Sequence, residues 1–345
     1  MGAGLTGLTL AYQLKKAGIS ATLIEARNRT GGRIHTLYNE AQAPVEMGAT
    51  WFGEKHEALL AFLAELQIPF FEQFLQGLTF YEPISTSPPQ SFLLPEQAPN
   101  LRIAGGSNAL IAKLLSHLDS GQLILGQRIQ KVDYQDGRFE LESEKQHFSC
   151  DVLVSTIPPK LLVETVVFSP RLPIDMVEKA KQTHTWMGES IKVAITYKRA
   201  FWRENGYSGS VFSNVGPISE LYDHSNMDAS HYALKGFMSG AFHGASHEQR
   251  KNLVLQQLGK YFGKEAQDYL TYSDCVWQYE PETFTPYSGY ILPHQNNGDA
   301  ILRAACFEGK LILAGTETAS AFPGYMDGAV RSGMESAAQI LQLME

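Results

Sequence analysis

The apolar and polar positions at the start of the chain predict a glycine turn, a helix and a short buried strand. Residues 5–17 carry apolar side chains at helical spacing, and Gly18 stands where such a helix would end. The apolar run ATLIEA follows and predicts a buried strand with Glu25 near its end. Only Met1 precedes the glycine turn, so the sequence shows no strand ahead of it.

The rest of the chain alternates between helical and strand-like patterns. Residues 54–100 begin as a helix (HEALLAFLAELQ) and continue as a proline-rich segment that predicts a loop or flap. Residues 122–156 predict a β-meander with a hairpin turn at QDGR, and residues 160–275 mix strands such as IKVAITY with helices. The C-terminal stretch from residue 309 reads as a strand, a glycine-rich loop and a long helix. This order predicts a mixed α/β fold.

The first glycine turn carries a pattern that is typical of dinucleotide binding. Gly2, Gly4 and Gly7 form GxGxxG directly before the helix, where free backbone N–H groups bind a pyrophosphate. Glu25 stands at the strand end from which a carboxylate accepts hydrogen bonds from a ribose diol. The glycine pattern alone is weak evidence, but the helix, the strand and Glu25 together favour a cofactor site. A carboxylate there favours an unphosphorylated ribose, as in FAD or NAD, over NADP.

A second glycine turn follows at Gly31 and Gly32, between Arg29 and Arg33. The backbone N–H groups of glycines and the bidentate donors of arginine suit a phosphate. An ordinary surface turn with two solvated arginines explains the same residues, and we favour it as long as the motif stands alone.

Charge and cysteine content exclude several classes of protein. The chain has 345 residues and a net charge of −8, without a basic run that would indicate nucleic-acid binding. Its three cysteines are far apart, and no apolar run is long enough for a membrane helix. We therefore expect a cytoplasmic protein without a nucleic-acid or membrane partner. His243 and His247 do not form HExxH, so we expect no metal; SHEQ there reads better as the cap of a helix.

Several motifs occur in one order across nearly the whole chain. They are GAGLTGL, RTGGR, EMGATWF, AGGSNAL, VSTIPP, MGESIKVAITY, WQYEPETFTPYS and AGTETASAFPGYMDGAV. As a set they resemble the flavin-containing amine oxidase family, which includes monoamine oxidase, polyamine oxidase and L-amino-acid oxidase. The resemblance implies a Rossmann-like FAD-binding domain built from residues 1–50, 101–160 and 290–345. A substrate-binding domain of residues 51–100 and 161–289 would be inserted into it.

The resemblance implies FAD as the cofactor and assigns the residues that would hold it. Gly2, Gly4 and Gly7 would meet the pyrophosphate and Glu25 the adenosine ribose, while the backbone of Val132 would contact the adenine. The helix that begins near Met326 and Asp327 would face the flavin with its N-terminus. The remaining residues expected around the phosphates, ribityl chain and flavin are Arg27, Gly31, Gly32, Arg33, Gly48, Ala49, Thr50, Gly315 and Glu317.

Three residues would carry the chemistry. Lys192 lies in IKVAITY, where a solvent-facing lysine of a half-exposed strand is the usual interpretation; the resemblance instead assigns it a water held against flavin N5. Tyr287 and Tyr325 would form an aromatic cage for the amine, although two core tyrosines are the alternative. Pro286 stands where some members carry the cysteine that attaches FAD, so FAD should be non-covalent.

The activity implied is transfer of hydrogen from the α-carbon of an amine to flavin N5, with O₂ as the acceptor and H₂O₂ as a product. One alternative keeps the flavin but changes the donor, as in desaturases, protoporphyrinogen oxidases and renalase-like enzymes. Another is a non-catalytic remnant. Lys192 together with Tyr287 and Tyr325 favours the amine oxidase. The sequence names no particular amine, and a homodimer is one assembly that it allows.

The chain departs from the family pattern at two places. The family precedes the glycine turn with a hydrophobic strand, and Met1 stands where that strand would end. We expect a truncated sequence or a late start codon; a real loss is the alternative and would leave neighbouring strands with unpaired backbone groups. The chain is also short between WFG and AGGSNAL, which predicts a more open substrate site.

Overall fold

The glycine turn and the first helix form as the pattern predicts. In the computed structural model, which describes residues 1–39 and 41–344, α1 (Leu5–Lys16) begins directly after Gly4. Its buried face packs on α8 (Met326–Met344), and Gly333 allows this close approach. A Cβ added at Gly333 would lie 2.7 Å from the carbonyl oxygen of Thr6. With α2 (Glu57–Glu65) and α3 (Asn108–Leu115), these helices enclose one hydrophobic core.

Two short parallel strand pairs lie beside this helical layer. β1 (Leu23–Ile24) pairs with β9 (Leu123–Ile124), and β13 (Leu153–Ser155) pairs with β20 (Leu311–Leu313). Met1 and Gly2 lie between the two pairs. The Met1 ammonium donates to the Val154 carbonyl at 2.6 Å, and Gly2 N–H donates to the Ile24 carbonyl at 2.8 Å. These two residues therefore join the strand pairs into one surface beneath the glycine turn.

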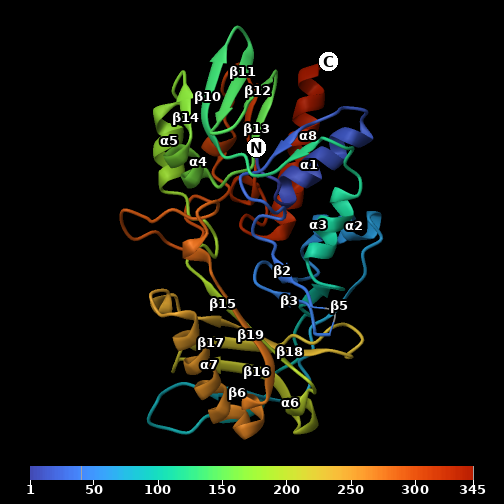
Figure 1. Ribbon diagram of the computed structural model, residues 1–345, viewed down its shortest axis with the longest axis vertical. Coiled ribbons are helices and arrows are strands. Elements are labelled where there is room, and N and C mark those ends of the chain that lie inside the picture. The colour runs from blue at the N-terminus through green and yellow to red at the C-terminus, as the bar shows by residue number, and fades with distance from the viewer. Residues whose placement is uncertain (40, 345) are drawn as a thin grey trace.

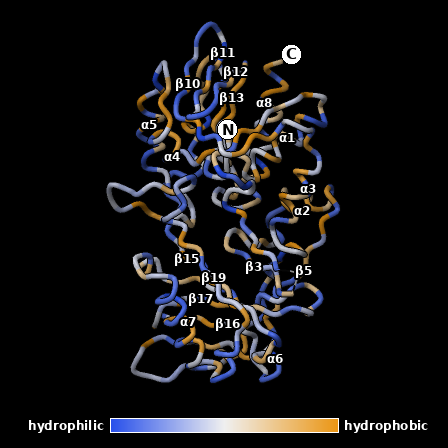
Figure 2. The backbone as a smooth tube through the Cα atoms, in the orientation of Figure 1, coloured by the Kyte–Doolittle hydropathy of each residue, from blue (hydrophilic) through white to orange (hydrophobic). Residues whose placement is uncertain are grey.

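A four-stranded sheet forms the upper edge of the molecule in Figure 1. Its order is β12-β11-β10-β14, and α4 (Pro159–Thr165) and α5 (Ile174–Lys181) lie beside it. The hairpin turn predicted at QDGR is confirmed, because Gln135 pairs with Arg138 while Asp136 and Gly137 have positive φ angles. The tip of this hairpin is hydrophilic (Figure 2). The strands are β10 (Ile129–Gln135), β11 (Arg138–Ser143), β12 (His147–Cys150) and β14 (Val167–Ser169).

A seven-stranded sheet fills the lower half of the molecule (Figure 1). Its order is β19-β15-β18-β17-β16-β6-β7, and β15 (Ile191–Tyr197) is buried along its whole length. Helix α7 (His247–Phe262) packs on it, and the predicted cap is confirmed: Ser246 Oγ accepts from Gln249 N–H and Gln249 returns a bond. The other strands are β6 (Leu78–Glu82), β7 (Gln90–Leu93), β16 (Tyr207–Ser213), β17 (Ile218–Asp223), β18 (Tyr232–Met238) and β19 (Tyr269–Val276).

The proline-rich segment differs from the loop predicted for it. β6 and β7 form an antiparallel hairpin at the edge of the large sheet, and the prolines fall in its turn and in the strand-free residues that follow. Small sheets of β2 (Thr36–Leu37) with β3 (Val45–Glu46), and of β4 (Trp51–Phe52), β8 (Leu101–Ile103) and β5 (Phe70–Glu72), connect the halves. A short helix, α6 (Phe201–Glu204), precedes β16.

The division into an FAD-binding and a substrate-binding domain stays a prediction, and one of its boundaries fits the observed sheets less well than another. β14 belongs to the expected substrate domain, yet it pairs with β10 in the upper sheet. The stretch up to α5 therefore lies with the upper half of the molecule, so a boundary after residue 181 fits better than one at residue 160.

Candidate functional site

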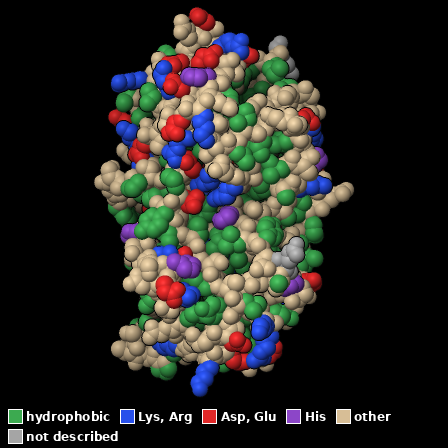
Figure 3. Space-filling model, in the orientation of Figure 1, with side chains coloured by type: hydrophobic (Ala, Val, Ile, Leu, Met, Phe, Trp, Pro, Cys, Tyr) green, Lys and Arg blue, Asp and Glu red, His purple; other side chains and the backbone are tan. Residues whose placement is uncertain are grey.

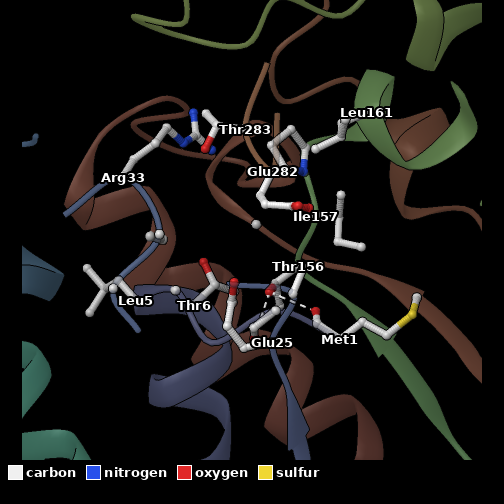
Figure 4. A pocket seen from close by; sticks show the side chains of 18 of the residues that line it. Met1, Leu5, Thr6, Glu25, Arg33, Thr156, Ile157, Leu161, Glu282 and Thr283 are labelled. Atoms are coloured by element: carbon white, nitrogen blue, oxygen red, sulfur yellow. Dashed lines mark hydrogen bonds between the residues drawn. The ribbon is translucent and has the colours of Figure 1, made fainter. Parts of the chain in front are cut away.

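A cavity lies where α1, α8 and the two parallel strand pairs meet. Figure 4 shows side chains from segments far apart in the sequence around it, with Glu25 and Thr156 on one side and Arg33 and Thr283 across from them. Of the predicted cofactor and catalytic residues, those that line it are Gly2, Gly4, Glu25, Arg27, Gly31, Gly32, Arg33, Ala49, Gly315, Tyr325 and Met326. Those that do not are Gly7, Gly48, Thr50, Val132, Lys192, Tyr287, Glu317 and Asp327.

Gly4 shows that the cavity fits a group held against the backbone. A Cβ added at Gly4 would lie 3.9 Å from its nearest protein atoms, so no protein contact requires glycine there. Its φ of −77° is open to any residue. Gly7 differs, because a Cβ there would lie 2.2 Å from the Gly2 carbonyl oxygen. The space in front of Gly4 is thus available to a ligand, whereas Gly7 maintains the fold of the turn.

Two helix N-termini face the cavity. Leu5 and Thr6 of the first turn of α1 line it, and so do Tyr325 and Met326 at the start of α8. The first N–H groups of a helix have no partner within the helix and carry a partial positive charge. The cavity therefore offers two sites for negative charge, which suit the pyrophosphate of FAD and the flavin edge on which negative charge develops when the flavin is reduced.

Glu25 is the acidic residue at the floor of the cavity. Its side chain is buried; one carboxylate oxygen accepts from Ala3 N–H at 2.8 Å and the other from Arg27 N–H at 2.9 Å. These two bonds fix the carboxylate and leave further lone pairs on both oxygens. The placement fits a carboxylate that accepts from a ribose diol.

Three arginines line the cavity, and each is already paired with a glutamate. Arg27 contacts Glu280 at 2.9 Å, and Arg33 forms a bidentate pair with the buried Glu317 at 2.5 and 2.8 Å. The third pair joins Arg128 and Glu282. The sequence did not predict this third pair or the nearby Thr156 as site residues. Thr156 lies in the motif VSTIPP and Glu282 in WQYEPETFTPYS, so their presence in these motifs was the signal that could have indicated them.

Lys192 lies one layer behind the cavity wall. Its Nζ is buried and donates to the Gly48 carbonyl at 2.5 Å, and the next residue, Ala49, lines the cavity. Burial lowers the pKa of Lys192 to about 8. The interpretation of Lys192 as a solvent-facing lysine on a half-exposed strand is therefore wrong. Gly48 is itself required by packing, because a Cβ there would lie 2.1 Å from the Arg33 carbonyl oxygen.

The two tyrosines expected to form a cage are placed differently from each other. Tyr325 lines the cavity, and its ring neighbours are those of His56, Trp186 and His294, at centroid distances of 5.4, 6.2 and 5.8 Å. Tyr287 instead packs on His184 and Phe284, and its hydroxyl accepts from Thr185 N–H at 2.8 Å. The aromatic rings next to Tyr325 are therefore those of His56, Trp186 and His294, and the cage of Tyr287 with Tyr325 stays a prediction.

Val132 and Asp327 were predicted to contact the cofactor, and neither lines the cavity. Val132 is an interior residue of β10, while Ile129, at the irregular start of the same strand, lines the cavity. The Asp327 carboxylate is buried; it accepts from Leu59 N–H at 2.8 Å and from Arg331 at 2.5 Å, which joins α8 to α2.

The described residues contain neither a cluster of metal-binding side chains nor a helix that could span a membrane. In residues 1–39 and 41–344, no group of three or more His, Cys, Asp or Glu could hold a metal ion. No helix of the same residues is long and apolar enough to cross a bilayer. Basic and acidic side chains are interspersed on the face shown in Figure 3.

Comparisons with known proteins identify a family, relatives and solved structures to which the chain is similar. The chain matches the family described as "Flavin containing amine oxidoreductase" over residues 5–77 and 69–341. It is 24% identical to "Probable flavin-containing monoamine oxidase A" of Dictyostelium discoideum, covering 99% of this chain and 96% of that protein. Two solved structures share the fold over 99% of this chain and 98% of theirs: putrescine oxidase bound to putrescine (21% identity, TM-score 0.85) and cyclohexylamine oxidase from Brevibacterium oxydans (20%, 0.87).

The family match spans most of the chain, and the cavity offers a glycine cradle and two helix N-termini where FAD would lie. The expected α/β fold with a Rossmann-like cofactor domain is also confirmed. The chain belongs to the flavin-containing amine oxidoreductase family, and its cofactor is FAD.

Proposed function

We propose that this enzyme oxidises an amine at its α-carbon, giving an imine that water hydrolyses, with O₂ reduced to H₂O₂. The observation that carries the proposal is the position of Lys192. Its buried Nζ stands beside Ala49 in the cavity wall, and its lowered pKa lets it hold or release a proton near neutral pH. Bound FAD supplies the acceptor for the two electrons and the hydrogen that leave the amine.

The residues of the chain would bind and orient the amine. The ring of Tyr325 lines the cavity and is 39% exposed, so an amine can approach it from solvent. Trp186 and His294 stack on each other at 3.8 Å and both face Tyr325. Aromatic faces attract a cationic or polarisable nitrogen, which supports an amine rather than an anionic donor. The exposed rim also supports the open site that the short chain predicts.

We propose that FAD is held without a covalent bond. Pro286 stands where some relatives carry the attaching cysteine, and the three free cysteines, Cys150, Cys275 and Cys306, do not line the cavity. Acid precipitation should therefore release all of the flavin into the supernatant. Flavin that stays with the precipitate would contradict non-covalent binding.

The experiment that tests the function is anaerobic mixing of the FAD-loaded protein with a panel of amines. The panel contains a monoamine, a diamine, a polyamine and an L-amino acid, and the flavin absorbance near 450 nm is followed in a stopped-flow instrument. Bleaching by one class, with H₂O₂ formed after air is admitted, supports the proposal. A flavin that dithionite bleaches but no amine does would favour a non-amine donor. A protein that binds no FAD would favour a remnant.

A further inference from the structure

A second lysine lies beside Lys192 on the same face of the large sheet. Lys235 of β18 is fully buried, at 0% exposure. Lys192 is in register with Phe237, and Lys235 is in register with Ala194, so the two lysines are diagonal neighbours on adjacent strands. Both amines lie over the Phe237 ring, at 5.5 and 5.8 Å from its centroid. Lys235 does not line the cavity.

A chain of hydrogen bonds links the two amines through the loop at the cavity wall. Lys192 Nζ donates to the Gly48 carbonyl at 2.5 Å, and Thr50 Oγ1 donates to the same carbonyl at 3.2 Å. Lys235 Nζ in turn contacts Thr50 Oγ1. The loop of Gly48, Ala49 and Thr50, which provides Ala49 to the cavity, is thus held by one lysine at each end.

If both lysines were protonated, the buried positive charges around this loop would outnumber the buried negative charges. Among the described residues neither lysine forms an ion pair with a carboxylate within 4.0 Å; the amines contact the uncharged Gly48 carbonyl and Thr50 hydroxyl instead. The buried carboxylate nearby is Glu46, whose oxygens accept from Thr36 and Ser107. The buried guanidinium of Arg102 is close enough to interact electrostatically with the same carboxylate. Other groups that face the pair are Glu220 and Tyr222 on β17, Cys275 on β19, and the buried His224.

Two further buried positive charges against one carboxylate and one guanidinium would be very costly. We propose that Lys192 and Lys235 act as one unit that holds a single positive charge, and that Lys235 is a positioning residue for the loop at residues 48–50. Burial and then the charge of Lys192 lower the pKa of Lys235 well below its usual value. The unit keeps one proton next to the wall of the cavity and can place it on either amine.

The role of the unit in amine oxidation rests on the proposed function, but its charge does not. Both lysines have pKa values near 10.4 in the unfolded chain, so unfolding at pH 7 restores the missing proton. A lysine whose pKa is lower in the folded than in the unfolded protein destabilises the fold, with the full cost below the folded-state pKa. Between the folded-state and the unfolded-state pKa this cost disappears, so the free energy of unfolding rises with pH over that range. The slope of this free energy against pH therefore counts the protons that unfolding takes up.

The test compares this proton count at pH 7 in FAD-loaded wild type, Lys192→Met, Lys235→Met, Lys235→Gln and Lys113→Met. Lys113 is an exposed lysine on α3, so its variant is the matched control and should keep the wild-type count. Removal of either buried lysine should lower the count by about one proton, since the lysine that remains then carries the charge. Lys235→Gln provides a second uncharged variant if Lys235→Met folds poorly.

Two results would overturn the unit. A wild-type count no higher than that of Lys235→Met would mean that both lysines are charged. A Lys192→Met count equal to that of wild type would mean that burial alone keeps Lys235 neutral.

The positioning role is tested separately with whichever amine reduces the flavin: Lys235→Met should lower kcat at least tenfold with FAD affinity unchanged, and an unchanged kcat would refute that role. The proton counts need no amine, so they stand or fall apart from the proposed function.

Discussion

Replacing Gly4 by alanine should separate cofactor binding from folding. The backbone at Gly4 has φ −77° and ψ −178°, which alanine adopts without strain. The added Cβ would meet the Gly31 carbonyl oxygen and Gly32 Cα at 3.9 Å, an ordinary contact. Alanine reduces the freedom of the unfolded chain, which stabilises by about 0.4–1 kcal/mol. It is a poorer residue than glycine before a helix, by a similar amount. The apoprotein should therefore unfold within about 0.5 kcal/mol of wild type.

FAD affinity should respond far more strongly. The methyl group would occupy the space in which a pyrophosphate approaches the N–H groups of α1, and at least one charge-assisted hydrogen bond would be lost. Such a bond contributes about 1.5–3 kcal/mol, so the Kd for FAD should rise roughly 10- to 150-fold. Urea unfolding of the apoprotein measures the first quantity, and quenching of FAD fluorescence on titration measures the second.

Gly7→Ala is the matched control. Its Cβ would lie 2.2 Å from the Gly2 carbonyl oxygen, so the turn must shift and the apoprotein should lose about 1–3 kcal/mol of stability. If Gly4→Ala instead bound FAD within threefold of wild type, the cradle assigned to Gly4 would be refuted. If Gly4→Ala destabilised the apoprotein as much as Gly7→Ala, glycine would be needed there for folding.

Three further changes probe the rest of the site. Lys192→Met should keep the yellow colour of bound FAD but slow flavin reduction or reoxidation at least tenfold in stopped-flow traces; unchanged rates would remove its assigned role. Tyr325→Ala should raise the KM for the amine or lower kcat by more than it changes the Kd for FAD, because the ring is at the exposed rim; the reverse order would make it a cofactor residue. Glu317→Gln leaves the guanidinium of Arg33 without its carboxylate, so it should cost roughly 1–3 kcal/mol in thermal or urea unfolding, and a loss below about 0.5 kcal/mol would show that the pair contributes little.

The sequence predicted the local turns well, because their chemistry is contained in a few neighbouring residues. The glycine turn before α1 and the QDGR hairpin need positive φ angles at glycine or aspartate, and the structure has them at Gly2, Asp136 and Gly137. The strand pattern around Val132 gives two faces of β10 but not the point along the strand that reaches the cavity, and Ile129 rather than Val132 lines it. The pairing of β10 with β11 is irregular between Ile129 and Lys131, next to the residue that lines the cavity, and such an irregularity has no signature in the hydrophobic pattern.

Long-range placement explains the other differences. Tyr287 follows a segment without regular strands or long helices, so no periodicity indicates where its ring lies. Nothing in the sequence around Lys235 indicates its burial, yet Thr50 and Trp51 lie against its amine and the residue is completely buried. A lysine on a strand can be assigned to solvent only when the element that covers its face is known.

The arginine–glutamate pairs around the cavity have a consequence for how the protein can be handled. Because Arg27, Arg33 and Arg128 already have carboxylate partners, the phosphates of FAD would depend on helix N-termini and backbone N–H groups more than on free cations. Interactions with buried backbone dipoles are screened much less by salt than those with exposed charges. Elution of the enzyme from an ion-exchange column in molar chloride should leave the flavin bound, whereas mild denaturant, which loosens the helix ends, should strip it.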